Sequence, residues 1–357
     1  RLVVTDTFVQ SGFRLPEIAV LFDWRDALRG LQTSQWILGE VRVAPVDLTG
    51  EQALAVLNSV RRASGLPAAL TTIRFESVTF TELSLLPGRY EALVRRGAGQ
   101  QEFGVVALKR LDGEGRVDLE ITPVPVAGGN PKFALFANRW PASVGPAVVW
   151  DEATAHGEFG AELLLVESFS VGARFGNFNG SASLVKREQG WQLAGSLRSP
   201  DLNVGELARH AAGLSGVDGA ESRMPLRGVG KLELTLAGSG STAAETLRRA
   251  SASGTGSVPG AVFSGLNLGL AATQGGAASA GGITRLTDLD FDVITSRGGL
   301  IVRNLNGRAG SLRLGGGFSV DPALQLNGSL RSEVASSRGA ASALIQIGGP
   351  ITSPTFH

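Results

Sequence analysis

The stretch RLGGGFSVDPALQLNGSLRS, Arg313–Ser332, shows the pattern that decides the fold. Apolar side chains take every second position on both sides of an Asp-Pro step, and glycine holds the same phase at Gly316 and Gly328. Such alternation is typical of a β-strand with one apolar face, and Asp-Pro indicates a turn. We therefore predict two strands that share an apolar face, formed by Leu312, Leu314, Phe318, Leu324, Leu326 and Leu330.

The same alternation recurs along much of the chain. Two further candidate apolar faces consist of Leu163, Leu165, Phe169, Val171 and Phe175, and of Leu232, Leu234 and Leu236. Asn-Gly and Asp-Gly pairs between apolar runs predict turns. These pairs are Asp112-Gly113, Asn179-Gly180 and Asn327-Gly328. The chain is therefore predicted to be mainly β.

Helical signals are few and short. The segments Thr49–Gly65, Asn203–Gly213 and Thr242–Ala250 each begin with a side chain that can cap a helix. The region Ala250–Thr284 carries no charge, but glycines and Pro259 interrupt every apolar run in it. A membrane span needs about 20 predominantly apolar residues. We therefore interpret this region as strands and loops, with GLNLGLAA as an alternating strand-like segment.

We expect the chain to have two parts. Residues 1–160 form a β-rich part with one helix near residues 50–63, and residues 161–357 form a second β-rich part. No recognisable signal peptide opens the chain, so we expect a mature chain or a fragment.

Composition argues against several functional classes. Lys and Arg number 33 and Asp and Glu 32, so the basic footprint typical of nucleic-acid binding is missing from the sequence. The chain has no cysteine, and His156, His210 and His357 lie far apart in the sequence, so no metal-ligand spacing is present. Neither a nucleophile elbow nor a phosphate-binding loop occurs. We expect a protein that is not an enzyme and needs no cofactor, metal or nucleic acid.

The acidic residues Asp288, Asp290 and Asp292 alternate with apolar ones. Paired carboxylates can serve a glycosidase or bind a metal, but the solvated face of an amphipathic strand explains this spacing more simply.

Each amphipathic strand needs cover for its apolar face. Two sheets can pack against each other as a closed sandwich, or one sheet can curl into an open groove that faces a ligand. The groove is favoured by glycines among the apolar positions, which leave room, and by Ser, Thr and Asn on the reverse face.

The order of several segments is similar to the C-terminal region of the AsmA family of envelope proteins. The first segment is a strand followed by a short helix. The second is a strand that ends in Gly-Ser-Gly, followed by a helix and a Gly-x-Gly strand. The third is a threonine-led strand with a Gly-rich hairpin, and the fourth is a Gly-x-x-x-x-Pro ending. These segments are Gly195–Gly213, Gly228–Val258, Thr284–Ser332 and Ile345–His357. Pro259-Gly260 departs from the family, which often has Asp-Gly at this place.

The resemblance implies an extended twisted antiparallel sheet, curled into an open hydrophobic groove, with a few short helices. It places the chain near TamB-like, bridge-like lipid carriers with a repeating β-groove. Such proteins are thought to conduct phospholipids across the periplasm of Gram-negative bacteria, between the inner and the outer membrane. We then expect phospholipid acyl chains on the three apolar faces above, inner- and outer-membrane components as partners, and an inner-membrane anchor outside this chain.

Two other functions stay open at this point. The chain can be a scaffold or assembly factor for outer-membrane or secretion components, with a closed β-sandwich core. It can also be a carbohydrate-binding or carbohydrate-active β-sandwich that uses Trp36, Trp140, Trp150 or Trp191.

Overall fold

A computed structural model describes most of the chain as two compact units, Arg1–Gly160 and Ala161–His357. The described residues are 2–8, 14–21, 40–49, 52–53, 56, 70, 72–81, 86–96, 103–122, 129–141, 149–160, 162–213, 226–274, 280–296, 299–337 and 339–357.

The first unit is one mixed sheet. Its strands are β1 (Leu2–Phe8), β2 (Arg14–Leu21), β3 (Glu40–Val43), β4 (Val46–Leu48), β5 (Thr72–Phe80), β6 (Arg89–Arg96), β7 (Phe103–Arg110), β8 (Arg116–Thr122), β9 (Lys132–Trp140) and β10 (Trp150–Phe159). From β5 to β10 each strand pairs antiparallel with the next. β3 and β4 instead run parallel to β5, so this sheet is mixed, with antiparallel pairs in the majority. The long connection between β4 and β5 permits that direction, because parallel neighbours need a crossover.

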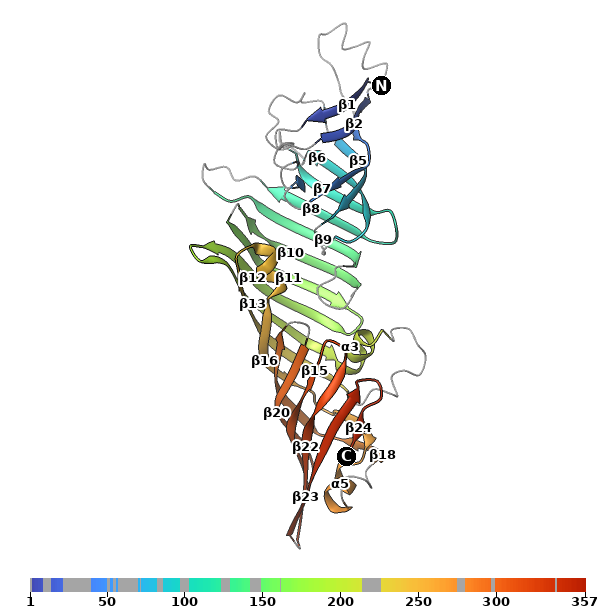
Figure 1. Ribbon diagram of the computed structural model, residues 1–357, viewed down its shortest axis with the longest axis vertical. Helices are drawn as coiled ribbons and strands as arrows, with labels where there is room; N and C mark the ends of the chain where they lie inside the picture. Colours follow the sequence, from blue (N-terminus) through green and yellow to red (C-terminus); the bar gives the residue numbers. More distant parts are fainter. Residues whose placement is uncertain are drawn as a thin grey trace. The chain divides into compact units, whose positions relative to one another are not determined.

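The second unit is a larger antiparallel sheet (Figure 1). Its main strands are β11 (Leu163–Ala173), β12 (Gly176–Arg187), β13 (Gly190–Asn203), β15 (Val229–Gly240), β16 (Ser251–Ser257), β19 (Asp288–Ser296), β20 (Gly299–Ala309), β21 (Leu312–Val320), β22 (Gln325–Ser336), β23 (Gly339–Pro350) and β24 (Thr355–Phe356). They pair in this order, each antiparallel to the next. No described strand joins the two ends of this series, so the sheet is open.

Two insertions leave this sheet, one between β13 and β15 and one between β16 and β19. The first holds helix α3 (Val204–Ala211) and strand β14 (Leu226–Arg227), and the second holds β17 (Val262–Leu266), α5 (Leu268–Gln274) and β18 (Ala280–Arg285). β14, β17 and β18 form a small separate sheet. We call β14, β17, α5 and β18 the cap, because α5 packs against β21, β22 and β23. A further helix, α4 (Ala243–Arg248), lies in the β15–β16 connection and packs on β13 and β15.

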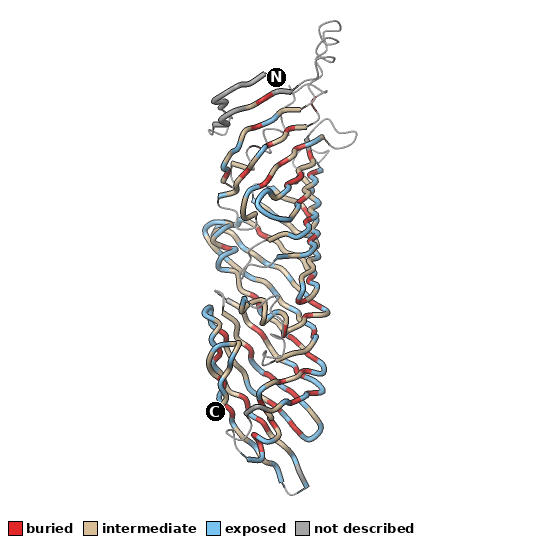
Figure 2. Tube along the Cα trace, turned by 90° about the vertical axis from the view of Figure 1, so that its right-hand side faces the viewer, coloured by how far each residue is buried: buried red, intermediate tan, exposed pale blue. Residues whose placement is uncertain are grey.

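Buried and exposed residues alternate along the strands, as Figure 2 shows. In β6 the pattern runs through buried Tyr90, Ala92 and Val94, with more exposed residues between them. In β21 and β22 the buried leucines Leu314 and Leu330 share the same alternation. The sequence prediction of a mainly β fold with one apolar face per strand is therefore confirmed.

The predicted helix starts are confirmed where the structure describes them. Asn203 caps α3 by accepting from the backbone N–H of Glu206, and Thr242 caps α4 by accepting from that of Glu245. Thr49 and Gln52 exchange side-chain to backbone hydrogen bonds of 2.9 and 3.2 Å, as a capping box should. Most of the helix expected near residues 50–63 lies outside the described residues.

Two of the four predicted turns are wrong, whereas Asp321-Pro322 lies between β21 and β22 as predicted. Asp112-Gly113 does lie between β7 and β8, but Asn179-Gly180 falls inside β12 and Asn327-Gly328 inside β22. Gly180 lies opposite Phe169, and Gly328 lies opposite Phe318. Gly180 makes room for the ring of Phe169, and Gly328 makes room for the backbone and Cβ of Phe318, so neither glycine serves to bend the chain.

GLNLGLAA is also not a strand throughout, because α5 begins at Leu268. The Asn267 side chain accepts from the N–H of Leu270 at 3.0 Å, which starts the helix. Leu268, Ala271 and Ala272 are buried with helical spacing. None of the described helices is long and apolar enough to cross a membrane.

Candidate functional site

The register of the second unit brings apolar residues from eleven strands onto one side of the sheet. Residues directly opposite each other on paired strands point to the same face. One row across the sheet consists of Phe169, Gly180, Leu197, Leu234, Gly254, Val293, Val302, Phe318, Gly328, Ile347 and Phe356. We call the side of the sheet that carries this row the apolar face.

Most of the predicted lining residues lie on the apolar face. Leu232 and Leu236 flank Leu234 at alternate positions of β15 and so share its side. Leu312, Leu314, Leu326 and Leu330 share the side of Phe318 through the register of β21 with β22. Leu324 lies in the turn between these two strands, with φ +60°, and Ile351 donates a backbone hydrogen bond to its carbonyl.

A β-bulge in β11 divides the set that the sequence placed on one face. Phe169 and Val171 pair with Gly180 and Phe178 and lie on the apolar face. Leu163 and Leu165 pair with Val185 and Ser183, which point to the opposite side. The register shifts between Val166 and Phe169, and the extra residue there reverses the alternation. The single-face prediction is therefore wrong for Leu163 and Leu165.

Phe175 is not part of the apolar face, because it lies in the turn between β11 and β12. Its ring packs against Phe178 at 5.7 Å and against His210 of α3 at 5.5 Å between centroids. Phe175 is 4% exposed. It anchors α3 to the β11–β12 turn instead of lining an open surface.

Glycines lie beside the largest side chains of the apolar face and leave space for them. A Cβ at Gly256 would lie 2.5 Å from the ring of Phe291, and one at Gly180 would lie 2.9 Å from the ring of Phe169. A Cβ at Gly328 would lie 2.4 Å from the carbonyl oxygen of Gly317. Such separations leave no room for a larger residue. The glycines therefore set how closely rings and strands approach on this face.

The cap closes the apolar face over β20–β23. Leu314, Leu330 and Ile345 are at most 2% exposed and form one buried cluster with Leu266 and Leu268 of the cap. Leu312 and Leu326 belong to the same cluster, and Phe318 and Leu324 pack against it. This end of the apolar face is a side-chain-filled core.

Buried hydrogen bonds fix the cap in place. Ser332 is fully buried on the apolar face, and its hydroxyl donates to the carbonyl of Leu268 at 2.6 Å. The hydroxyl of Thr284 donates to the carbonyl of Leu266 at 2.9 Å and accepts from the N–H of Leu268 at 2.8 Å. These bonds satisfy the polar groups at the start of α5, so the cap is bound as an integral part of the unit.

The apolar face is more open over β11–β16. Leu193, Leu197, Leu232, Leu234 and Leu236 are only partly buried, and none belongs to the cluster beneath the cap. One end of this region is bounded by α4, whose Thr246 donates to the carbonyl of Trp191 at 3.3 Å. We call these five leucines, with Phe169 and Val171, the open rung.

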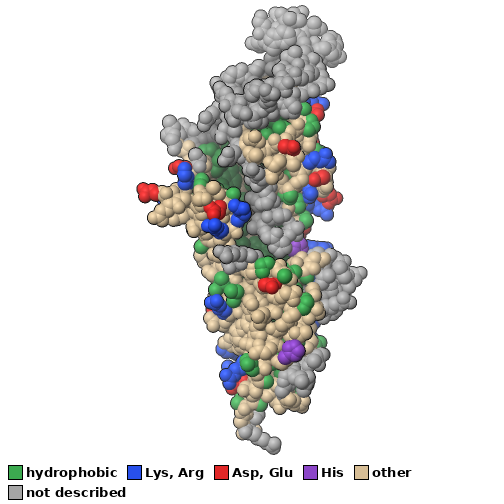
Figure 3. Space-filling model, in the orientation of Figure 1, with side chains coloured by type: hydrophobic (Ala, Val, Ile, Leu, Met, Phe, Trp, Pro, Cys, Tyr) green, Lys and Arg blue, Asp and Glu red, His purple; other side chains and the backbone are tan. Residues whose placement is uncertain are grey.

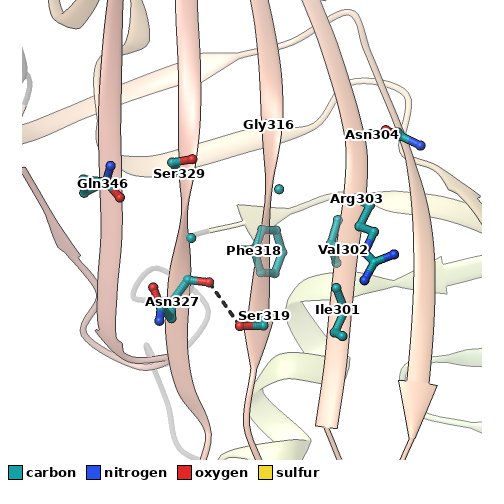
Figure 4. A pocket seen from close by; sticks show the side chains of 12 residues that line it. Ile301, Val302, Arg303, Asn304, Gly316, Phe318, Ser319, Asn327, Ser329 and Gln346 are labelled. Atoms are coloured by element: carbon teal, nitrogen blue, oxygen red, sulfur yellow. Dashed lines mark hydrogen bonds between the residues drawn. The ribbon is translucent and has the colours of Figure 1, made fainter.

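The reverse side of the same strands is polar. The hydroxyls of Ser181 and Ser196 lie 3.4 Å apart, and Thr235 is exposed between the half-buried leucines of β15. Further along the sheet, Ser319, Asn327, Ser329 and Gln346 surround a shallow hollow of about 630 Å³ over glycines (Figure 4). No residue with a resolved pKa shift lines this hollow. It offers hydroxyls, amides and one guanidinium, from Arg303, to solvent.

The first unit carries a comparable apolar row, which is buried along its whole described length. The row consists of Val43, Phe75, Ala92, Leu108, Val117, Ala137 and Ala153. On the other side of β5, Arg74 bonds Glu40 at 2.7 Å and also contacts Glu91. The hydrogen bond with Glu40 raises the pKa of the Arg74 guanidinium above its ordinary value. This cluster stabilises the sheet surface and offers no reactive group.

The structure brings two of the four tryptophans proposed for sugar binding together. Trp140 and Trp150 lie opposite each other on β9 and β10 and are half-buried. Trp191 lies in the second unit, and Trp36 is outside the described residues.

Charged side chains are dispersed. On the face shown in Figure 3, described acidic and basic groups are interspersed, and neither sign forms a large patch. Asp288 and Asp290 are exposed on β19, and Asp292 accepts a hydrogen bond from Asn304 at 2.6 Å. The interpretation of these carboxylates as a solvated strand face is confirmed for Asp288 and Asp290.

Comparison with protein-family models gave no match for this chain, and comparisons with curated proteins and with solved structures gave none either.

Proposed function

We propose that this chain is a non-enzymatic lipid carrier whose open rung binds phospholipid acyl chains. The observation that carries the proposal is the combination of a continuous apolar face with only partial burial of its leucines over β13 and β15. In this proposal the chain conducts phospholipids across the periplasm between the inner and outer membranes. The compartment and the membranes rest on the AsmA resemblance of residues from Gly195 onward.

The physical case is the cost of exposing lipid tails. Each buried methylene stabilises by about 0.8 kcal/mol, so two tails in water cost well over 10 kcal/mol. A surface that alternates apolar and polar faces shelters the tails on one side and meets water on the other. Head groups can remain at the open margin, and no catalytic group is required.

The closed end of the apolar face limits where lipid can lie. Leu312, Leu314, Leu326 and Leu330 already contact the cap or its cluster. The proposed lipid site therefore consists of the open rung, and the leucines beneath the cap hold the unit together. Lipid contact by Leu312, Leu314, Leu326 and Leu330 stays a prediction, and it would require the cap to leave.

Native mass spectrometry and lipid extraction of the purified chain test the proposal. We expect co-purifying phospholipid in the wild type and its loss in Leu234→Asp, which places a charge in the open rung. The matched control is Thr235→Asp, because Thr235 neighbours Leu234 in β15 but is exposed on the polar side. The control should keep its lipid. A wild-type chain that carries no lipid and takes up no fluorescent lipid would contradict the proposal.

The scaffold function is favoured by one observation, which is the side-chain-filled core beneath the cap. A protein closed in this way along its whole length would have no lipid site and would act through its surface and sheet edges. The scaffold function would be favoured if the wild type and both variants fold and none of the three carries lipid.

A further inference from the structure

The hollow on the polar side of β20–β23 contains a position that cannot carry a side chain (Figure 4). A Cβ at Gly317 would lie 2.6 Å from the carbonyl oxygen of Val302, so no larger residue fits there. Gly317 pairs with Ser329 on β22, and Ser319 lies two positions further along β21 on the same side. The backbone is therefore bare between two hydroxyl groups. Glycine inside a strand often marks a place where a ligand or another backbone approaches closely.

A β-bulge shapes the hollow on its β20 side. The register of β20 with β21 shifts between Val302 and Leu305, and Asn304 has φ +50° there. Arg303 and Asn304 are both exposed, whereas successive residues of a regular strand point to opposite faces. Bulges are over-represented beside functional sites, where they re-aim a side chain. The bulge thus brings two neighbouring polar side chains to the margin of the hollow.

The bulge also leaves one positive charge without a partner. Arg303 lies opposite Asp292 of β19, but the Asp292 carboxylate accepts a hydrogen bond from the Asn304 amide at 2.6 Å. Among the described residues, the Arg303 side chain has no hydrogen-bond or ion-pair partner. A guanidinium presents its N–H donors in a planar fork, which matches a carboxylate through two parallel hydrogen bonds. The hollow therefore offers a free binding group for one carboxylate.

The other polar groups of the hollow suit a ligand rich in hydroxyl groups. Asn327 and Gln346 carry exposed carboxamides, and Ser319 and Ser329 carry hydroxyls. The Ser319 hydroxyl donates to the carbonyl of Asn327 at 3.2 Å, so its oxygen is still able to accept. Carboxamides and hydroxyls both donate and accept hydrogen bonds, as the hydroxyls of a sugar do. The volume of about 630 Å³ lies in the range of small-molecule sites.

We propose that this hollow binds a sugar that carries a carboxylate, such as a uronic acid residue. The sugar ring lies over Gly317, where the backbone is bare. Its hydroxyls bond the side chains of Ser329, Asn327 and Gln346. Its carboxylate bonds the guanidinium of Arg303.

The surroundings favour this ligand over two others. The Asp292 carboxylate opposite Arg303 repels a second negative charge, which disfavours a dianion such as a phosphate group. The hollow is shallow, so an acidic peptide would find no enclosed pocket for its side chains. The site lies on the opposite side of the sheet from the open rung, and it does not depend on the lipid-carrier proposal.

Isothermal titration calorimetry of the full chain with a tetramer of galacturonic acid tests the proposal. The methyl ester of the same tetramer is the neutral reference, and physiological salt suppresses long-range attraction between exposed charges. We expect the acid to bind about tenfold more tightly than the ester, and Arg303→Gln to remove that difference. The matched control is Arg308→Gln, because Arg308 is exposed on the polar side of the same strand but does not line the hollow. The control should bind the acid as the wild type does.

A second variant tests the contacts with the sugar hydroxyls. Gln346→Ala should weaken the acid and the ester by the same factor, because its amide does not contact the carboxylate. A wild-type chain that does not bind the acid would overturn the proposal. Equal losses in Arg303→Gln and Arg308→Gln, both folded by circular dichroism, would also overturn it, because they would show attraction by surface charge alone. A tetraglutamate peptide that binds as tightly as the acid would overturn the assignment to a sugar.

Discussion

Leu330 and Leu234 lie on the same apolar face but in different surroundings. Leu330 is 1% exposed beneath the cap, whereas Leu234 is only partly buried in the open rung. Leu330→Ala removes buried methyl groups and leaves a cavity, so we expect a loss of about 2.7–5 kcal/mol in the free energy of unfolding. Leu234→Ala leaves no closed cavity and removes atoms that are already partly hydrated, so we expect about 1 kcal/mol.

The assay is thermal and urea unfolding of lipid-extracted protein, followed by circular dichroism. For a unit of this size each kcal/mol shifts Tm by about 2–4 °C, so Leu330→Ala should lower Tm by about 5–20 °C and Leu234→Ala by about 2–4 °C. Equal losses for the two variants would refute the reasoning, because they would show that both leucines lie in a closed core. The open rung, and the lipid site built on it, would then be abandoned.

Three further predictions concern single contacts. Ser332→Ala removes the buried hydrogen bond that ties Leu268 of α5 to β22 and should cost about 0.5–1.5 kcal/mol in chemical unfolding, with faster hydrogen exchange in α5. Gly256→Val drives a side chain into the ring of Phe291 and should cost about 1–3 kcal/mol in the same assay. The hydrogen bond from Arg110 holds the pKa of Asp112 below its ordinary value, so its stabilising effect is present at neutral pH and is lost as pH falls through that lowered pKa. The difference in Tm between wild type and Asp112→Asn should therefore shrink toward acid pH, and a constant difference would contradict this cause.

Local sequence signals predicted the strands and the helix starts well. Alternation in β15 and in β21–β22 depends only on side-chain order, and the caps at Asn203 and Thr242 lie within three residues of their partners. Asn327-Gly328 could not be assigned in the same way. Its glycine makes room for Phe318 on the neighbouring strand. The order of residues along one strand does not reveal a contact with another strand.

The site was harder to predict than the fold. The bulge near Val166 reverses the side of Leu163 and Leu165. The four apolar residues 163–166 leave the side of the strand ambiguous, and only the two successive polar residues Glu167 and Ser168 mark the shift. The sequence also does not show that Leu330 is more deeply buried than Leu234, because both residues lie in regularly alternating strands. It arises from the cap, whose residues lie in separate insertions and reach only one end of the face.

The geometry of the open rung matches the size of its proposed ligand. Phe169, Gly180, Leu197, Leu234 and Gly254 form one row over β11, β12, β13, β15 and β16. Four spacings of about 4.8 Å between neighbouring strands give a row about 19 Å long. One leaflet of a bilayer core is about 15 Å thick, half of the roughly 30 Å of the whole core. A tail laid across the strands would therefore stay on apolar and glycine positions over its full length, with α4 bounding one end of those strands. Transport farther along the sheet would require the lipid to pass the core beneath the cap. Evidence that the cap stays closed during transport would therefore count most strongly against the lipid-carrier proposal.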